Sequence, residues 1–134
     1  MSKIYKPTEK DKFMNSKMKK YFRLKLMDWK NELLKESNQT LSNLQKEENT
    51  AKPDITDRAS EEMERSFELR TRDRERKLIR KIDQALQRVD DGFYGFCEDT
   101  GEPIGIKRLE ARPIATLCIE AQERHERMEK TQVD

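Results

Sequence analysis

The sequence predicts an all-α protein in which a long antiparallel coiled-coil hairpin is followed by a small turn-rich module and a C-terminal helix. Charged residues make up 42% of the chain, against about a quarter in an average domain, and it contains four Gly and four Pro. Two long stretches lack Gly and Pro, whereas all four glycines come after residue 91. This composition favours long solvent-exposed helices over a thick core.

The first helix is predicted from Phe13 to about Glu48. Its apolar residues recur at steps of three and four, which keeps them on one helical face. At 1.5 Å per residue the helix would be roughly 50 Å long. The apolar stripe contains Met14, Met18, Phe22, Leu26, Trp29 and Leu33, and it resumes at Leu41 and Leu44.

A turn around Pro53 precedes the second helix, which is predicted from about Arg58 to Asp90 with Asp57 as its N-cap. Two helices of similar length joined by a short turn form an antiparallel hairpin. We interpret Trp29 and Phe67 as packed residues of its seam. The apolar positions of the second helix are Ala59, Met63, Phe67, Leu78, Ile82, Ala85 and Val89.

The chain is expected to divide into four segments. Residues 1–15 form an N-terminal segment packed near the module, and residues 16–91 form the coiled coil with its tip at about 49–57. Residues 92–117 form the module, and residues 118–134 form the C-terminal helix.

The module has the layout of a four-cysteine zinc finger in which two ligands are replaced. Cys97 begins a C-x-x-T and Cys118 begins a C-x-x-A, so Thr100 and Ala121 occupy the positions of partner cysteines. A structural zinc site uses about four nitrogen or sulfur ligands. We therefore expect a degenerate finger that keeps its fold with no metal, in which the two remaining thiols lie close enough to form a disulfide on oxidation.

Other donors near the module do not complete a zinc site in this interpretation. His125 is seven residues beyond Cys118, which is about 10 Å along a helix, whereas a zinc–ligand bond is about 2 Å long. Glu98 and Asp99 are expected to be solvated, and Glu120 lies on the C-terminal helix. The predicted cofactor content is therefore none.

Several classes of protein are excluded by the composition. No apolar run reaches the ~18 residues of a membrane span, and no signal segment begins the chain, so we expect a cytoplasmic protein without membrane contact. Two cysteines are too few for a disulfide framework. The single histidine, His125, has no partner at motif spacing, and no phosphate-binding Gly-rich loop occurs, so we expect no enzymatic activity.

Charge is segregated along the second helix. Residues 58–69 carry two basic and four acidic residues, a net charge of −2, whereas residues 70–81 carry seven basic and two acidic residues, a net charge of +5. Together with Lys107, Arg108 and Arg112, this basic segment is suited to a phosphate-rich ligand. A solvated face is the simpler alternative, and a nucleic-acid groove is disfavoured because no aromatic residues are interleaved.

Several long motifs carry a resemblance to a known family. PDITDRAS, ELRTRDRERKLIRKI, GFYGFC, GEPIGIKRLEARP and LCIEA resemble the DksA/TraR family of bacterial transcription factors, over roughly residues 13–128. The resemblance implies a monomer that binds RNA polymerase through its secondary channel, without sequence-specific DNA contact. It also implies destabilisation of open promoter complexes together with guanosine tetraphosphate in the stringent response.

The resemblance also implies roles for particular residues. Asp54, Asp57 and Ala59 match the tip motif that is needed for activity, and Arg74 is expected to help dock the second helix on polymerase. The family's site for guanosine tetraphosphate, here called the alarmone site, has one further position that is usually a lysine. This position is Gln122 here, which weakens the expected contact with the nucleotide. The positions matching the rest of that site are Leu78, Lys81 and Arg112.

Three alternatives remain open. Transcript-cleavage factors of the Gre type use a similar acidic tip to help polymerase hold a second Mg²⁺, which two carboxylates can share with polymerase. The chain could also be a coiled-coil adaptor without a role in transcription. Direct nucleic-acid binding through residues 70–81 would be revealed by a steep salt dependence.

Overall fold

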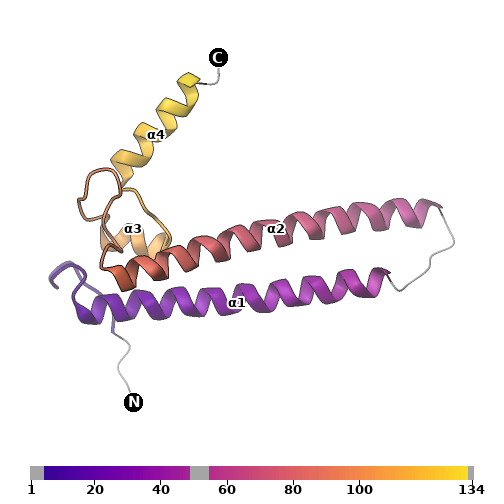
Figure 1. Cartoon of the computed structure of the whole chain (residues 1–134), viewed down its shortest axis with the longest axis horizontal. Helices are drawn as coiled ribbons and strands as arrows, with labels where there is room; N and C mark the ends of the chain where they lie inside the picture. Colours follow the sequence, from indigo (N-terminus) through magenta and orange to yellow (C-terminus); the bar gives the residue numbers. More distant parts are fainter. Residues whose placement is uncertain (1–4, 49–54, 133–134) are drawn as a thin grey trace. The chain divides into compact units, whose positions relative to one another are not determined.

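The computed structural model describes residues 5–48 and 55–132, with only the backbone described at 44, 47, 48, 55–57 and 132. Over this part of the chain the protein is helical, and it contains one isolated β-bridge between Phe96 and Pro103 but no strand. The all-α prediction is confirmed. The helices, labelled in Figure 1, are α1 (Ser16–Glu48), α2 (Ile55–Asp91), α3 (Ile106–Ala111) and α4 (Ile119–Gln132). No helix in the described ranges is both long and apolar enough to span a membrane.

The chain forms two compact units. One, here called the module unit, contains Met1–Met27 and Asp83–Asp134, and the other, the hairpin unit, contains Asp28–Ile82. Helices α1 and α2 each contribute residues to both units.

The module unit is built around the first part of α1. Met14, Met18, Phe22 and Leu26 are buried, as their spacing predicts. Spacings of four place Met18, Phe22 and Leu26 on one face of α1, whereas Met14 precedes the helix and has a positive φ of 56°. They share the core with residues of α2 and of the segments that follow it: Ala85, Val89, Tyr94, Cys97, Ile104, Leu109, Ala115 and Ala121.

Helix α1 begins three residues later than the sequence pattern suggests. The side-chain Oδ1 of Asn15 accepts a hydrogen bond from the amide of Met18 at 2.8 Å, and the carbonyl of Asn15 accepts one from Lys19 at 3.0 Å. These contacts identify Asn15 as the N-cap. Phe13 lies before the cap, and its ring packs edge-on against Phe96, with centroids 5.5 Å apart.

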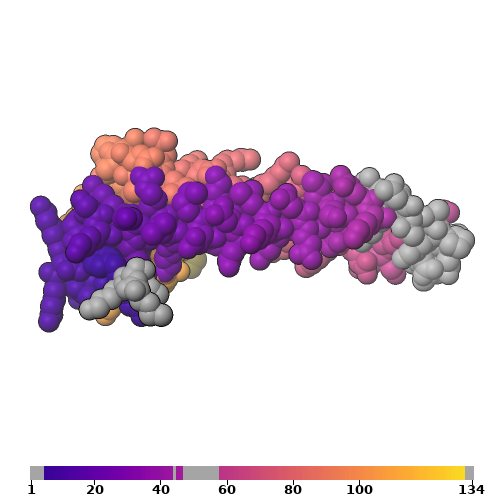
Figure 2. All heavy atoms as spheres, turned by 90° about the horizontal axis from the view of Figure 1, so that it is seen from below, coloured from indigo at the N-terminus to yellow at the C-terminus, as the bar shows by residue number. Residues whose placement is uncertain are grey.

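In the hairpin unit, α1 and α2 run antiparallel (Figure 1). Leu33 and Ile82 are buried, and Trp29 is half-buried. In the space-filling view of Figure 2, atoms of α1 make up most of the visible face along the hairpin.

Two expectations about α2 are wrong. Met63 is 75% exposed and Phe67 is 60% exposed, so neither belongs to the seam. The inward-facing positions at that level are occupied by charged residues instead. Helix α2 also begins at Ile55, which places Asp57 within its first turn and not at its N-cap.

Candidate functional site

The turn that follows Cys97 is held by backbone hydrogen bonds. The amide of Cys97 donates to the carbonyl of Glu102 at 2.8 Å, and the amide of Gly101 donates to the carbonyl of Cys97 at the same distance. A further bond of 2.9 Å, from the amide of Glu98 to the carbonyl of Thr116, joins the turn to the segment that leads to Cys118. The two cysteine-bearing segments are therefore neighbours.

Cys97 is buried and its thiol is acidic. Burial acts to raise the pKa of Cys97, but hydrogen bonds from the Thr100 hydroxyl and from the amides of Cys118, Thr100 and Asp99 outweigh it and lower the pKa to about 6. A thiolate is the form of cysteine that binds metal. Cys118 is a half-buried free thiol.

Arg88, near the end of α2, connects that helix to the module. Its Nη1 donates to Glu98 at 2.8 Å, and its Nη2 donates to the carbonyls of Phe93 and Phe96 at 3.2 and 2.9 Å. The backbone carbonyl of Arg88 accepts bonds from the amides of Phe93 and Tyr94. One guanidinium thus satisfies several groups of the turn after α2, a geometry that lysine cannot supply.

A second polar contact holds α3 against α1. Lys25 Nζ donates to the Glu110 carboxylate at 2.6 Å and to the Glu110 carbonyl at 3.1 Å. Burial, with a further contribution from Glu110, raises the pKa of Tyr21 to about 12. Burial acts to raise the pKa of Glu110 as well, but interactions with Lys25 and Tyr21 outweigh it and hold that pKa below its ordinary value.

The acidic residues near Cys97 are engaged with protein partners, which the sequence does not predict. Glu98 binds Arg88, and the Asp99 carboxylate lies 2.6 Å from Nε2 of His125 on α4. Among the basic residues of the module, Arg108 Nε donates to the carbonyl of Leu117 at 2.9 Å, whereas Arg112 is exposed.

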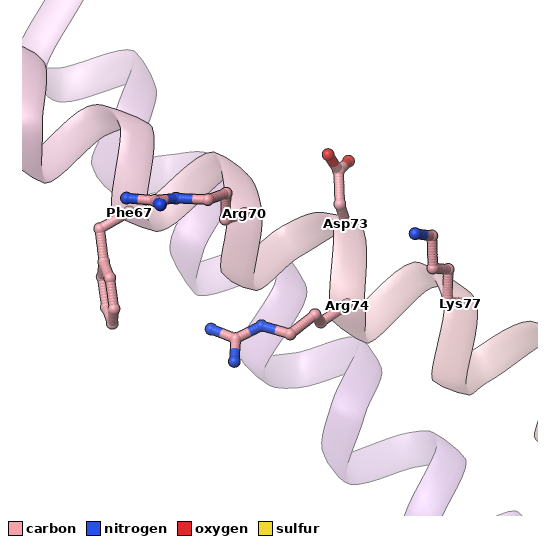
Figure 3. Close-up of a pocket in the computed structure, with 5 residues that line it drawn as sticks. All are labelled: Phe67, Arg70, Asp73, Arg74 and Lys77. Carbon is pink, nitrogen blue, oxygen red and sulfur yellow. The ribbon is translucent and has the colours of Figure 1, made fainter. Parts of the chain in front are cut away.

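The hairpin unit presents a hollow of about 450 Å³ on the outer side of α2. It is lined by Phe67, Arg70, Asp73, Arg74 and Lys77, which we call the outer strip (Figure 3). Figure 3 shows Phe67 and Arg74 extending from the same side of α2, and Arg70 reaching along the helix toward Phe67. Three basic residues, one acidic residue and an exposed aromatic ring make this surface basic and partly apolar.

The structure places the predicted site residues unevenly. Asp54 lies outside the described residues, only the backbone of Asp57 is described, and Ala59 is exposed. Arg74 belongs to the outer strip. No contact described in the structure tests the roles predicted for these residues at the tip and in docking.

The predicted alarmone residues fall in both units. Leu78, half-buried, and Lys81, exposed, belong to the hairpin unit, whereas Arg112 belongs to the module unit. Gln122 on α4 donates to Glu126 at 3.3 Å. The alarmone site stays a prediction.

Sequence reasoning missed the other members of the outer strip. Phe67, Arg70, Arg74 and Lys77 follow one another at steps of three, four and three, the same spacing that marks a helical face. That signal is visible in the sequence, but assigning Phe67 to the core concealed it.

Two family models match most of the chain. "DnaK suppressor protein DksA, N-terminal domain" matches residues 18–89, and "Prokaryotic dksA/traR C4-type zinc finger" matches residues 92–127. The chain is 62% identical over 131 residues to the "RNA polymerase-binding transcription factor DksA" of Caulobacter vibrioides, covering 97% of this chain and 91% of the relative. It is 45% identical over 126 residues to the protein of the same name from Escherichia coli, covering 94% and 83%.

A solved structure agrees with these matches. The transcription factor DksA2 from Pseudomonas aeruginosa superimposes with a TM-score of 0.82 at 43% identity, over 88% of this chain and 90% of that one. The similarity extends over both units, so it concerns the whole fold and not one motif.

The match to a C4-type zinc finger corrects one expectation. We expected no bound zinc because two of the four cysteine positions are Thr100 and Ala121, and the family match over residues 92–127 contradicts this, since it points to zinc binding. The loss of two cysteines was therefore an unsafe basis for excluding the metal.

The residues in these positions fit zinc only in part. Cys97 is a buried, acidic thiol suited to bind metal, and Cys118 lies on the neighbouring segment. Thr100 donates its hydroxyl to Cys97, and Ala121 is buried and has no donor atom. The described residues contain no group of three or more His, Cys, Asp or Glu side chains that could hold a metal ion, so they do not make up a four-ligand set.

The family models and the relatives agree with the resemblance carried by the sequence motifs. Two consecutive models together account for residues 18–89 and 92–127, and the relatives align over nearly the full chain. The hairpin, the module and the C-terminal helix are the parts that this similarity covers. The chain belongs to the DksA family of transcription factors, with a C-terminal module of the DksA/TraR zinc-finger type.

Proposed function

We propose that this chain is a transcription factor that binds bacterial RNA polymerase. The observation that carries the proposal is its 62% identity, over 97% of its length, to a relative named as an RNA polymerase-binding transcription factor. On this proposal the chain enters the secondary channel, destabilises open promoter complexes and works in the cytoplasm as a monomer that reads no DNA sequence.

The outer strip supports a docking role for α2. Arg70, Arg74 and Lys77 provide positive charge beside the exposed ring of Phe67. Arginine and aromatic side chains, phenylalanine included, are enriched at protein interfaces relative to the rest of the surface. The strip therefore suits a partner surface that combines carboxylates with an apolar contact.

The docking role is tested by measuring the affinity of purified polymerase for Arg74→Ala. We expect about tenfold weaker binding, because a central arginine contact is lost. Arg76→Ala is the matched control, since Arg76 is also exposed but lies about two and a half turns from Phe67, on the opposite side of α2. Equal loss of affinity in both variants would show that only net charge matters.

Alarmone binding is proposed for Leu78, Lys81 and Arg112. Two of these are basic and exposed, as a phosphate-rich ligand requires. With guanosine tetraphosphate, Lys81→Ala and Arg112→Ala should inhibit transcription less than the unmodified chain does, while all three proteins act alike without the nucleotide. A deficit that persists without the nucleotide would instead assign these residues to docking.

The Gre-like alternative is separable from this proposal by the product formed. On stalled elongation complexes we expect no shortened transcripts, whereas on a ribosomal promoter we expect faster decay of open complexes. Transcript shortening that depends on Asp57 would support the cleavage role and contradict ours.

A further inference from the structure

Near the turn, the half-buried positions of α2 that face α1 are mostly charged residues. On α2 the half-buried positions follow steps of four and three, the spacing of a coiled-coil seam. Toward the module unit this register continues into Ile79 and Ile82. Toward the turn it consists of Glu61, Arg65, Glu68, Arg72 and Glu75.

These charges alternate in sign along α2 itself. Glu61 and Arg65 are four residues apart, as are Glu68 and Arg72, and Arg72 is followed by Glu75 at three. Opposite charges at these spacings support a helix without help from a partner. Helix α2 therefore retains its internal stabilisation when nothing packs against this face.

Two polar atoms of this part of α2 are unfavourably placed when it packs against α1. Arg72 Nε and Glu75 Oε2 are buried and make no hydrogen bond, which is unfavourable for polar atoms. Burial, with the nearby Glu36 of α1, raises the pKa of Glu75, so an acid of one arm lies near an acid of the other. The association of the two arms is weak here because charges, not apolar side chains, lose contact with water.

The facing part of α1 is also a poor helix by composition. Residues 37–43 read SNQTLSN, and residues of these types, leucine and glutamine excepted, have low or moderate helix propensity. This part of α1 is therefore less able than α2 to remain helical without a packing partner.

We propose that α1 from Ser37 to Glu48 detaches locally from α2, while α2 stays helical. The detachment exposes few apolar side chains and leaves the alternating charges of α2 at their helical spacings. Near the turn, α2 then stays helical while α1 opens. This property follows from the residues between the two helices and does not depend on the proposed function.

Amide hydrogen exchange of the full chain, read by mass spectrometry, tests this asymmetry. Peptides from residues 37–48 should exchange about tenfold faster than peptides from residues 55–66, because local openings differ in free energy across a structure. Both segments lie at similar distances along the chain from the turn, so simple fraying of the hairpin end predicts equal rates. Equal rates would overturn the proposal.

A seam variant tests the cause. Glu68→Leu, Arg72→Leu and Glu75→Leu combined should slow exchange in residues 37–48 several-fold, because an apolar seam replaces the charged one. The matched control combines Glu62→Leu, Glu64→Leu and Arg76→Leu, which alters two glutamates and one arginine of α2 at exposed positions. The control should leave exchange in residues 37–48 unchanged. No slowing in the seam variant, or the same slowing in both, would contradict the proposed mechanism.

Discussion

Gly95 illustrates how a single residue holds the module together. Its φ of +89° lies in the region that favours glycine, and an added Cβ would lie 2.9 Å from Cε of Met14. Cγ of Met14 and Cζ of Phe13 would each lie 3.2 Å from the added Cβ as well, so more than the flexible end of Met14 would have to shift. The position therefore requires glycine for two independent reasons.

We expect Gly95→Ala to lower the free energy of unfolding by about 2 kcal/mol, through backbone strain and overpacking. Gly101→Ala is the control, because Gly101 has a φ of +73° but nothing lies within 4 Å of the added Cβ. Denaturant unfolding should show the smaller loss for Gly101→Ala. Equal losses would mean that contact with Met14 contributes nothing.

Glu110 links stability to pH. Its folded-state pKa lies below the ordinary 4.5, so its contribution is present above the ordinary pKa and is lost as pH falls through the lowered one. Glu110→Gln should reduce the melting temperature at neutral pH, with the difference vanishing in strong acid. Glu102→Gln, at an exposed position, should have little effect at either pH. A difference that persists in strong acid would point to lost packing instead.

At the scale of elements, the N-cap decides where α1 begins. Asn15 satisfies the amide of Met18, which has no partner within the helix. We expect Asn15→Ala to cost about 1 kcal/mol in stability and Asn15→Ser to restore most of it, as measured by thermal unfolding. If serine does not restore stability, a role other than capping would be indicated.

The helices were predictable to different degrees. The first part of α1 was predicted correctly because Met18, Phe22 and Leu26 are apolar residues at one helical spacing. On α2 the prediction was correct for Ile82, Ala85 and Val89, which are buried, but wrong nearer the turn, where Met63 and Phe67 are apolar and exposed. Apolar residues at helical spacing can lie on more than one face of a helix. Which face is buried depends on the residues that pack against it.

At the scale of the whole molecule, the proposed function predicts a division of labour between the tip and the outer strip. Asp57→Asn should bind polymerase with unchanged affinity and yet fail to inhibit a ribosomal promoter, because the tip acids act after docking. Glu62→Gln, which removes an exposed acid farther along α2, should retain inhibition. Parallel loss of affinity and inhibition in Asp57→Asn would contradict this division.

The sequence by itself determined the two long helices, the glycine-rich module and the family, because helical periodicity and long motifs are local properties of the chain. Tertiary structure decided which face of α2 turns inward, where Arg88 directs its guanidinium, and that the Thr100 side chain forms a hydrogen bond with Cys97. These outcomes depend on groups distant in sequence that compete for the same buried space and the same hydrogen bonds. The spacing of residues within one helix does not show which of these groups will be buried or hydrogen-bonded.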